Sequence, residues 1–220
     1  MSIEARADLI IATPAGLSPG DQFRIVFLTV GTTEATSSDI GHYNTFVNND
    51  AISQAGGSGN NAVYGSTVLT WTAIASTSAV SAISNIGSFG VPVYLASGTL
   101  VTPSDTVAGL WSGSLQAPIN EFLTNPVFFN TSVWTGTLPN GTGAGSFTLG
   151  SGSEFGSTPG SSNKVNAEWV ETGAVPSNVR NNMYGISQVL TAVPEPSTYA
   201  MALAGIAFSG FSMRRRRRRA

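Results

Sequence analysis

The residues of this chain that could perform acid–base chemistry are few. His42 is the only histidine, and the chain contains no cysteine. A Ser-His-acid site also needs an activated serine that is exposed at a strand-to-helix turn, and the sequence indicates no such serine. We therefore interpret His42 as a surface or capping residue, and we predict no catalytic residue.

Two carboxylates, Glu168 and Glu171, lie three residues apart around Trp169 and Val170. Glycoside hydrolysis needs two carboxyl groups about 5 to 9.5 Å apart. Residues three apart on the strand expected here point to opposite faces, so we interpret this pair as solvated acids. A secreted hydrolase that acts on polysaccharide or protein stays open as the alternative to a non-enzymatic protein.

Metal and cofactor binding have no recognisable pattern either. Without cysteine there are no thiolate ligands and no disulfides. Asp39 and Asp105 are isolated acids, whereas calcium needs about six to eight oxygen ligands from several segments. The glycine-rich stretches lack the phosphate-binding G-x-x-x-x-G-K-[ST] pattern. We predict no metal and no cofactor.

Aromatic side chains are the remaining candidates for binding, because their faces stack on sugar rings. Each of the four tryptophans stands in an apolar cluster, as core residues do. We expect most of them to pack in the core, and we assign Trp111 and Trp134 as candidate ligand-facing residues.

The charges of the chain are distributed unevenly. Charged residues make up only 10% of it, and six of the ten basic residues form one run at the C-terminus. The body before Val193 holds four basic residues and eleven acids, a net charge near −7. Nucleic-acid binding depends on Lys and Arg that neutralise phosphates, so the acidic body disfavours nucleic acid, and we predict no nucleic-acid partner.

We predict that residues 8–193 form one secreted domain. Alternation and β-branched content indicate a strand buried on both faces at 22–30. Polar caps before apolar residues at helical spacing predict a helix from about Asp39 to Gln54 and a second one that ends near Ile86. Further strands are expected at 67–75, 91–96, 167–170 and 183–193, and the Gly/Ser tract 146–162 predicts an exposed, mobile loop.

The order of short anchors in the middle of the chain is similar to the endostatin-like branch of the C-type-lectin-like fold. The anchors are Val91-Pro92-Val93, Leu110-Trp111-Ser112-Gly113, Val133-Trp134-Thr135-Gly136 and Pro139-Asn140-Gly141. The resemblance implies an α+β domain with two helices, short antiparallel strands and long loops. The disulfides, the calcium-binding sugar-recognition triplets and the zinc-binding histidines of that fold are all missing from this sequence.

The last 27 residues carry three signals in a fixed order. Pro194, Glu195 and Pro196 come first, residues 197–213 follow without a charge, and a cationic run ends the tail: Arg214, Arg215, Arg216, Arg217, Arg218 and Arg219. A helix over the uncharged run would rise roughly 25 Å, slightly less than the roughly 30 Å hydrocarbon core of a bilayer. Since arginine costs about 2.5 to 3.5 kcal/mol at the bilayer centre, we expect a transmembrane helix with the arginines cytoplasmic and the body outside.

This tail resembles the PEP-CTERM sorting signal of Gram-negative bacteria. The resemblance implies transient anchoring in the inner membrane, recognition of Pro-Glu-Pro by an exosortase, removal of the helix, and release or attachment at the cell surface. A plain membrane anchor or a nucleic-acid-binding arginine run is the alternative. The uncharged helix directly before the arginines favours the sorting signal.

The two termini therefore predict an exported cell-surface or extracellular-matrix protein. Residues 1–7, with the small-x-small sequence Ala5-Arg6-Ala7, are interpreted as the remnant of an export signal whose start is expected upstream of Met1. Residues 194–220 are the sorting signal. We expect a non-enzymatic binding or structural component of exopolysaccharide or biofilm, with exosortase, the inner membrane and extracellular polysaccharide as partners.

Overall fold

A computed structural model describes residues 8–57, 59–124 and 129–193. The expected export-signal remnant, the sorting residues Pro194, Glu195 and Pro196, the expected membrane helix and the arginine run lie outside the described residues. Of the helices within the described ranges, none is both long and apolar enough to cross a bilayer.

Strands make up most of the regular structure. They are β1 (Leu9–Ile10), β2 (Gln22–Leu28), β3 (Ala62–Tyr64), β4 (Thr67–Val68), β5 (Trp71–Ala73), β6 (Val93–Leu95), β7 (Leu100–Thr102), β8 (Ser132–Trp134), β9 (Pro159–Ser161), β10 (Asn182–Ser187) and β11 (Leu190–Thr191). The helices are α1 (Ile40–Gln54) and α2 (Ala82–Ile86), with 3-10 turns η1 (Gly145–Phe147) and η2 (Ala167–Trp169).

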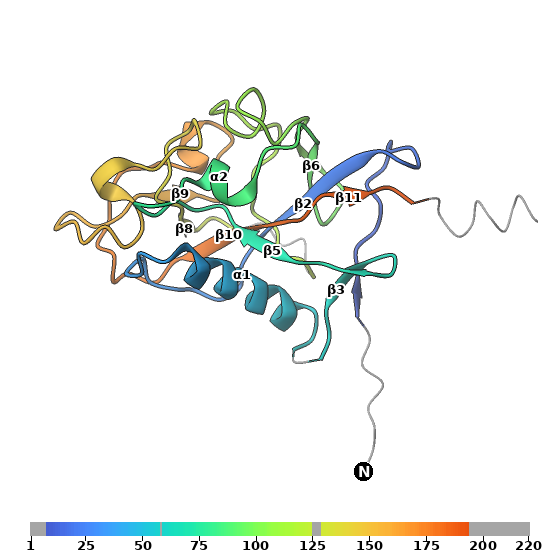
Figure 1. Cartoon of the computed structure of the whole chain (residues 1–220), viewed down its shortest axis with the longest axis horizontal. Helices are drawn as coiled ribbons and strands as arrows, with labels where there is room; N and C mark the ends of the chain where they lie inside the picture. The colour runs from blue at the N-terminus through green and yellow to red at the C-terminus, as the bar shows by residue number, and fades with distance from the viewer. Residues whose placement is uncertain (1–7, 58, 125–128, 194–220) are drawn as a thin grey trace, which may run out of the picture.

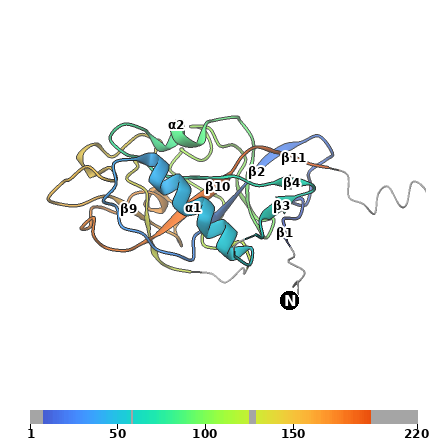
Figure 2. The ribbon, with the colours of Figure 1, turned by 60° about the horizontal axis from the view of Figure 1, so that its bottom comes forward.

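β10 is the strand around which the central sheet is built. It pairs antiparallel with β2 on one side, and on the other side it pairs parallel with β8 and then antiparallel with β5. β6 and β7 continue the sheet beyond β2, β9 continues it beyond β8, and β11 pairs with the start of β2. The described strands thus form a curled, mixed eight-stranded sheet beside a smaller β1-β3-β4 sheet (Figures 1 and 2).

The two faces of the central sheet pack against separate cores. From β2, Phe23, Ile25 and Phe27 enter one core, whereas Val26 and Leu28 enter the other, as the two-residue period of a strand requires. α1 and the small sheet cover the first core, while α2, η2 and much of the segment between β7 and β8 cover the second (Figure 1). The strand predicted at 22–30 is confirmed over Gln22–Leu28, where it is buried on both faces, whereas Val30 beyond its end is exposed.

α1 follows the predicted bounds closely because its start is determined locally. The Asp39 side chain accepts a hydrogen bond from the Gly41 amide at 2.9 Å, as an N-cap residue does. Tyr43, Val47 and Ala51 then bury one stripe of the helix. The second predicted helix is only five residues long, and it begins after the cap residue Ser81.

The expected α+β, C-type-lectin-like (endostatin-like) fold is wrong. The described part is mostly β, and parallel pairs join β2 to β6, β8 to β10 and β1 to β3 where short antiparallel strands were expected. The anchors that carried the resemblance are short apolar groups such as Val133 and Trp134, both fully buried. Such groups indicate which residues are buried, but they do not determine how strands pair.

Two local predictions are also corrected. The strand expected at 167–170 is replaced by the 3-10 turn η2 over Ala167–Trp169, whose cap residue Asn166 accepts a hydrogen bond from the Glu168 amide. The Gly/Ser tract 146–162, expected as an exposed loop, supplies the edge strand β9 and buries Ser157 and Ser162. Gly160 packs so closely on the Trp169 carbonyl that a side chain would not fit. Small residues are therefore used here for close packing.

Candidate functional site: the exit strand before the sorting motif

The segment that leads from the body toward Pro194 is held by the sheet. Leu190 and Thr191 of β11 lie opposite Phe23 and Gln22 of β2. Leu190 is buried in the core on the α1 side of the sheet, so the strand is fixed by apolar packing as well as by its backbone hydrogen bonds.

Ala192 continues this attachment beyond the strand. Its amide donates to the Asp21 carbonyl at 2.7 Å, and its carbonyl accepts from the Gly20 amide at 2.9 Å. The turn that supplies these groups is itself closed, because the Asp21 carboxylate accepts from the Ser18 amide at 2.7 Å. Ala192 is buried as a result.

Val193, the last described residue, is held by a side chain from a distant strand. Its amide donates to the Tyr64 hydroxyl oxygen at 3.1 Å. The same hydroxyl group lies 2.8 Å from Thr13 Oγ1, so Tyr64 links β3, the segment after β1 and the exit of the chain. The Val193 side chain is half exposed. The body is thus anchored up to the residue that directly precedes Pro194.

The candidate acid–base residues do not form one site. His42 is exposed in the first turn of α1, where its ring meets that of Tyr43 edge-on at 5.1 Å. Glu168 lies in η2, and its carboxylate forms an exposed ion pair with Lys164 at 3.1 Å. α1 and η2 pack against opposite faces of the central sheet, which separates His42 from Glu168 and from Glu171 just beyond η2.

The two isolated aspartates have structural roles. Asp39 caps α1. The Asp105 carboxylate is buried against the Arg24 guanidinium at 3.1 Å and accepts hydrogen bonds from the amides of residues 89–91. Over the described ranges there is no group of three or more His, Cys, Asp or Glu side chains that could hold a metal ion.

Trp111 and Trp134, the candidate ligand-facing aromatics, lie in the core. Trp111 is 2% exposed and packs against Trp169, and Trp134 is fully buried with its indole N–H donated to the Thr33 and Val179 carbonyls. Neither ring offers a face to solvent.

Sequence reasoning missed the residues that anchor the exit. Tyr64 and Val193 are separated by 129 positions, and no local pattern marks either one as a partner of the other. The only available signal was the position of Pro194 directly after an apolar segment, since a proline favours extended backbone in the residue before it.

Comparison with known proteins identifies the segment that this exit leads into. Residues 192–218 match the family model of the PEP-CTERM protein-sorting motif. The motif implies a protein that is exported through the membrane, processed by an exosortase as its partner and sorted to the cell surface. Among curated proteins, no match to the chain is found.

Proposed function

We propose that this protein is a non-enzymatic binding or structural component of the extracellular polysaccharide matrix. In this proposal the tail holds the chain in the inner membrane for a time, with the arginine run in the cytoplasm. The exosortase then removes the helix and the body reaches the cell surface or the matrix.

The observation that carries the proposal is the junction between the body and the sorting motif. The matched segment starts at Ala192, which is still bonded to Gly20 and Asp21. The folded body therefore extends to the first residue of the matched segment. Cleavage at or after Pro-Glu-Pro would leave the described fold complete.

A non-enzymatic role is supported by the positions of the candidate acids and bases. His42 and Glu168 belong to opposite faces of the sheet, and Glu168 is paired with Lys164. General acid–base catalysis needs its groups within hydrogen-bond reach of the same substrate atoms. The body also carries a net charge near −7, which favours uncharged polymers over polyanions as ligands.

Replacing Pro194-Glu195-Pro196 by three alanines in the native host tests the sorting step. We expect the wild-type protein to appear at the surface with a mass that has lost the tail, and the variant to stay in the membrane with its full mass. Pro103→Ala, which changes an exposed proline of the body, is the matched control and should be processed normally. Normal processing of the triple variant would overturn the sorting part of the proposal.

The non-enzymatic part has a separate test. The purified full-length protein is incubated with polysaccharide from its host, and new reducing ends are measured beside a His42→Ala, Glu168→Gln double variant. We expect no turnover by either protein. Turnover by the wild type that is lost in the double variant would instead support a secreted hydrolase.

A further inference from the structure

Phe155 is a large apolar side chain whose exposure has no structural explanation. It is 74% exposed at the tip of the loop before β9. Phe89 is also exposed, but the Arg24 guanidinium lies 5.5 Å from the centre of its ring, so that ring has a packing role. No comparable contact accounts for Phe155 among the residues that the structure describes.

The loop that carries Phe155 is held at both ends. At its start, the Gly150 amide donates to the Ala35 carbonyl at 2.8 Å. At its end, Ser157 and Val175 exchange two backbone hydrogen bonds, of 2.9 and 3.0 Å, and Ser157 Oγ lies 2.9 Å from Ser177 Oγ. The loop between these attachments is short, so Phe155 is presented from a defined position.

A groove of about 340 Å³ lies beside this loop. Glu154 and Gly156, the two neighbours of Phe155, line it, so Phe155 belongs to the same loop as these lining residues, although its own side chain is not among the lining groups. The polar groups among the other lining residues are those of Thr36, Ser153, Ser177 and Asn178, and the rest of the lining consists of Ala, Gly and Pro residues. This volume lies within the range of small-ligand sites, about 300 to 1,000 Å³.

The residues that line the groove favour some classes of ligand and disfavour others. No Lys or Arg lines it, and Glu154 adds a negative charge, so phosphate and other anions are disfavoured. Ser and Glu are depleted in the cores of protein–protein interfaces, which disfavours a protein partner. Hydroxyl, amide and carboxylate groups beside one aromatic face suit a ligand that has many hydroxyls and apolar C–H faces.

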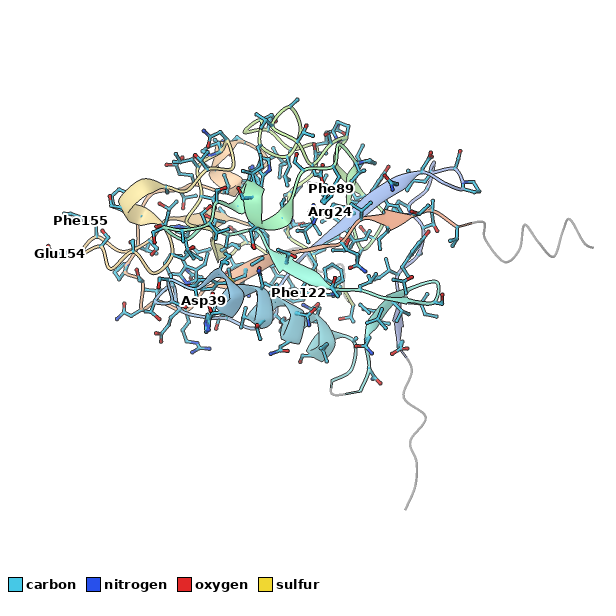
Figure 3. The ribbon with its side chains drawn as sticks, in the orientation of Figure 1. Arg24, Asp39, Phe89, Phe122, Glu154 and Phe155 are labelled. Atoms are coloured by element: carbon cyan, nitrogen blue, oxygen red, sulfur yellow. The ribbon has the colours of Figure 1, made fainter. Side chains whose placement is uncertain are left out.

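The site lies far from the exit strand β11. The loops between η1 and β9 stand at one end of the long axis of the body, and β11 leaves the body at the opposite end (Figures 1 and 2). Glu154 and Phe155 extend outward from the loop end (Figure 3). A chain tethered through its tail would therefore present this site away from the membrane.

We infer that Phe155 and the groove beside it bind a segment of an uncharged polysaccharide. The partly positive C–H groups of one sugar ring face the negative face of the phenyl ring. The Glu154 carboxylate accepts hydrogen bonds from sugar hydroxyls, and the Asn178 amide both donates and accepts. This inference rests on the proposed function for the source of the polymer, and it assigns the site on the body that contacts it.

Affinity electrophoresis of the full-length chain in nonionic detergent tests the site. Native gels contain dextran, mannan, galactomannan or the neutral polysaccharide of the host, and dextran sulfate is the anionic comparison. We expect at least one neutral polymer to retard the wild type and Phe155→Trp. Phe155→Ala should weaken this retardation about fivefold or more, as truncation of a central aromatic contact does. Val107→Ala removes a different exposed apolar side chain, 57% exposed, and should not change it.

Three results would overturn the inference: no retardation by any neutral polymer, retardation by dextran sulfate alone, or equal retardation of wild type and Phe155→Ala. Urea unfolding of each variant checks that the fold is kept, since Phe155 is exposed and should not affect it. Mature mass and surface release are measured for the same variants in the host. Absence of neutral-polymer binding by a wild type that is processed normally rejects this site, whereas failed processing of the wild type rejects the proposed function itself.

Discussion

Arg24 Nη1 lies 3.1 Å from Asp105 Oδ2, and both side chains are buried. Arg24 Nε also donates to the Ser187 carbonyl at 2.7 Å, so the pair joins β2, β10 and the segment after β7. Burial lowers the pKa of Arg24, while the hydrogen bond and the charge of Asp105 oppose this shift. The buried cation therefore depends on Asp105.

Asp105→Ala should destabilise the protein strongly. It would leave an unpaired guanidinium in the core and remove the acceptor of the Phe89, Gly90 and Val91 amides. We expect a loss of about 3 to 5 kcal/mol in the free energy of unfolding, measured by urea titration. Lys164→Ala breaks the exposed pair with Glu168 and should cost less than about 1 kcal/mol. Equal losses would show that the buried pair has no special role.

The two tryptophans singled out in the sequence allow a matched comparison. Trp134→Phe leaves the Thr33 and Val179 carbonyls without their indole donor. The indole N–H of Trp111 is buried and has no hydrogen-bond partner among the described residues, so Trp111→Phe removes an unsatisfied donor. Both changes replace a buried indole by a smaller phenyl ring. We expect Trp134→Phe to lower the free energy of unfolding, measured in urea, by about 1 to 2 kcal/mol more than Trp111→Phe does. A larger loss for Trp111→Phe would contradict this assignment.

Stability should fall at alkaline pH because of buried tyrosines. Burial raises the pKa of Tyr43 from 10.0 to about 12, although its hydrogen bond with the Ser37 backbone opposes the shift. In the unfolded chain the phenol ionises first, so unfolding releases a proton and the stabilisation is lost as the pH rises from about 10 toward 12. Burial raises the pKa of Tyr184 in the same direction. Urea midpoints between pH 8 and 12 measure the effect.

Tyr43→Phe separates the contribution of Tyr43 from that of the other tyrosines. The variant removes one phenol that stays protonated in the fold, so its urea midpoint should depend less steeply on pH above 10. The midpoint at pH 8 should still decrease, because the hydroxyl group donates to the Ser37 carbonyl at 2.8 Å. An unchanged slope above pH 10 would show that Tyr43 does not titrate differently in the two states.

The sequence predicts best where a structure is determined by nearby residues. α1 begins at its Asp39 cap and runs to Gln54 as expected, since the cap and the apolar spacing are local. The partners of β10 come from β2, β5 and β8, which are far apart in the chain. Such pairing depends on long-range packing that no periodicity in the sequence encodes, so the fold class could not be derived from the order of short anchors.

The candidate sites divide in the same way. The sorting motif was recognisable because its signals are contiguous, and the family match at 192–218 confirms it. The exit anchors and the Phe155 groove are assembled from distant segments, and the groove combines residues near 35, 153 and 177. The composition of the Gly/Ser tract led to a wrong prediction as well. Such a tract is typical of a flexible loop, whereas Gly160 here allows close backbone packing against Trp169.

Tyr64→Phe should loosen the exit of the chain. It removes the hydroxyl that accepts from the Val193 amide and contacts Thr13, at a cost of about 0.5 to 1.5 kcal/mol in unfolding free energy. Hydrogen exchange of the Val193 amide should become faster, while the Ala192 amide, bonded to Asp21, stays protected.

Tyr94→Phe is the matched control for this change. The Tyr94 ring also meets Phe23 edge-on, at 6.2 Å compared with 5.3 Å for Tyr64, but its hydroxyl forms no hydrogen bond with a described residue. Exchange at Val193 should therefore match the wild type in this variant. Only Tyr64→Phe removes a hydroxyl group that contacts Val193. If exchange at Val193 is unchanged in this variant as well, the pairing of β11 with β2 holds the exit without the Tyr64 hydroxyl.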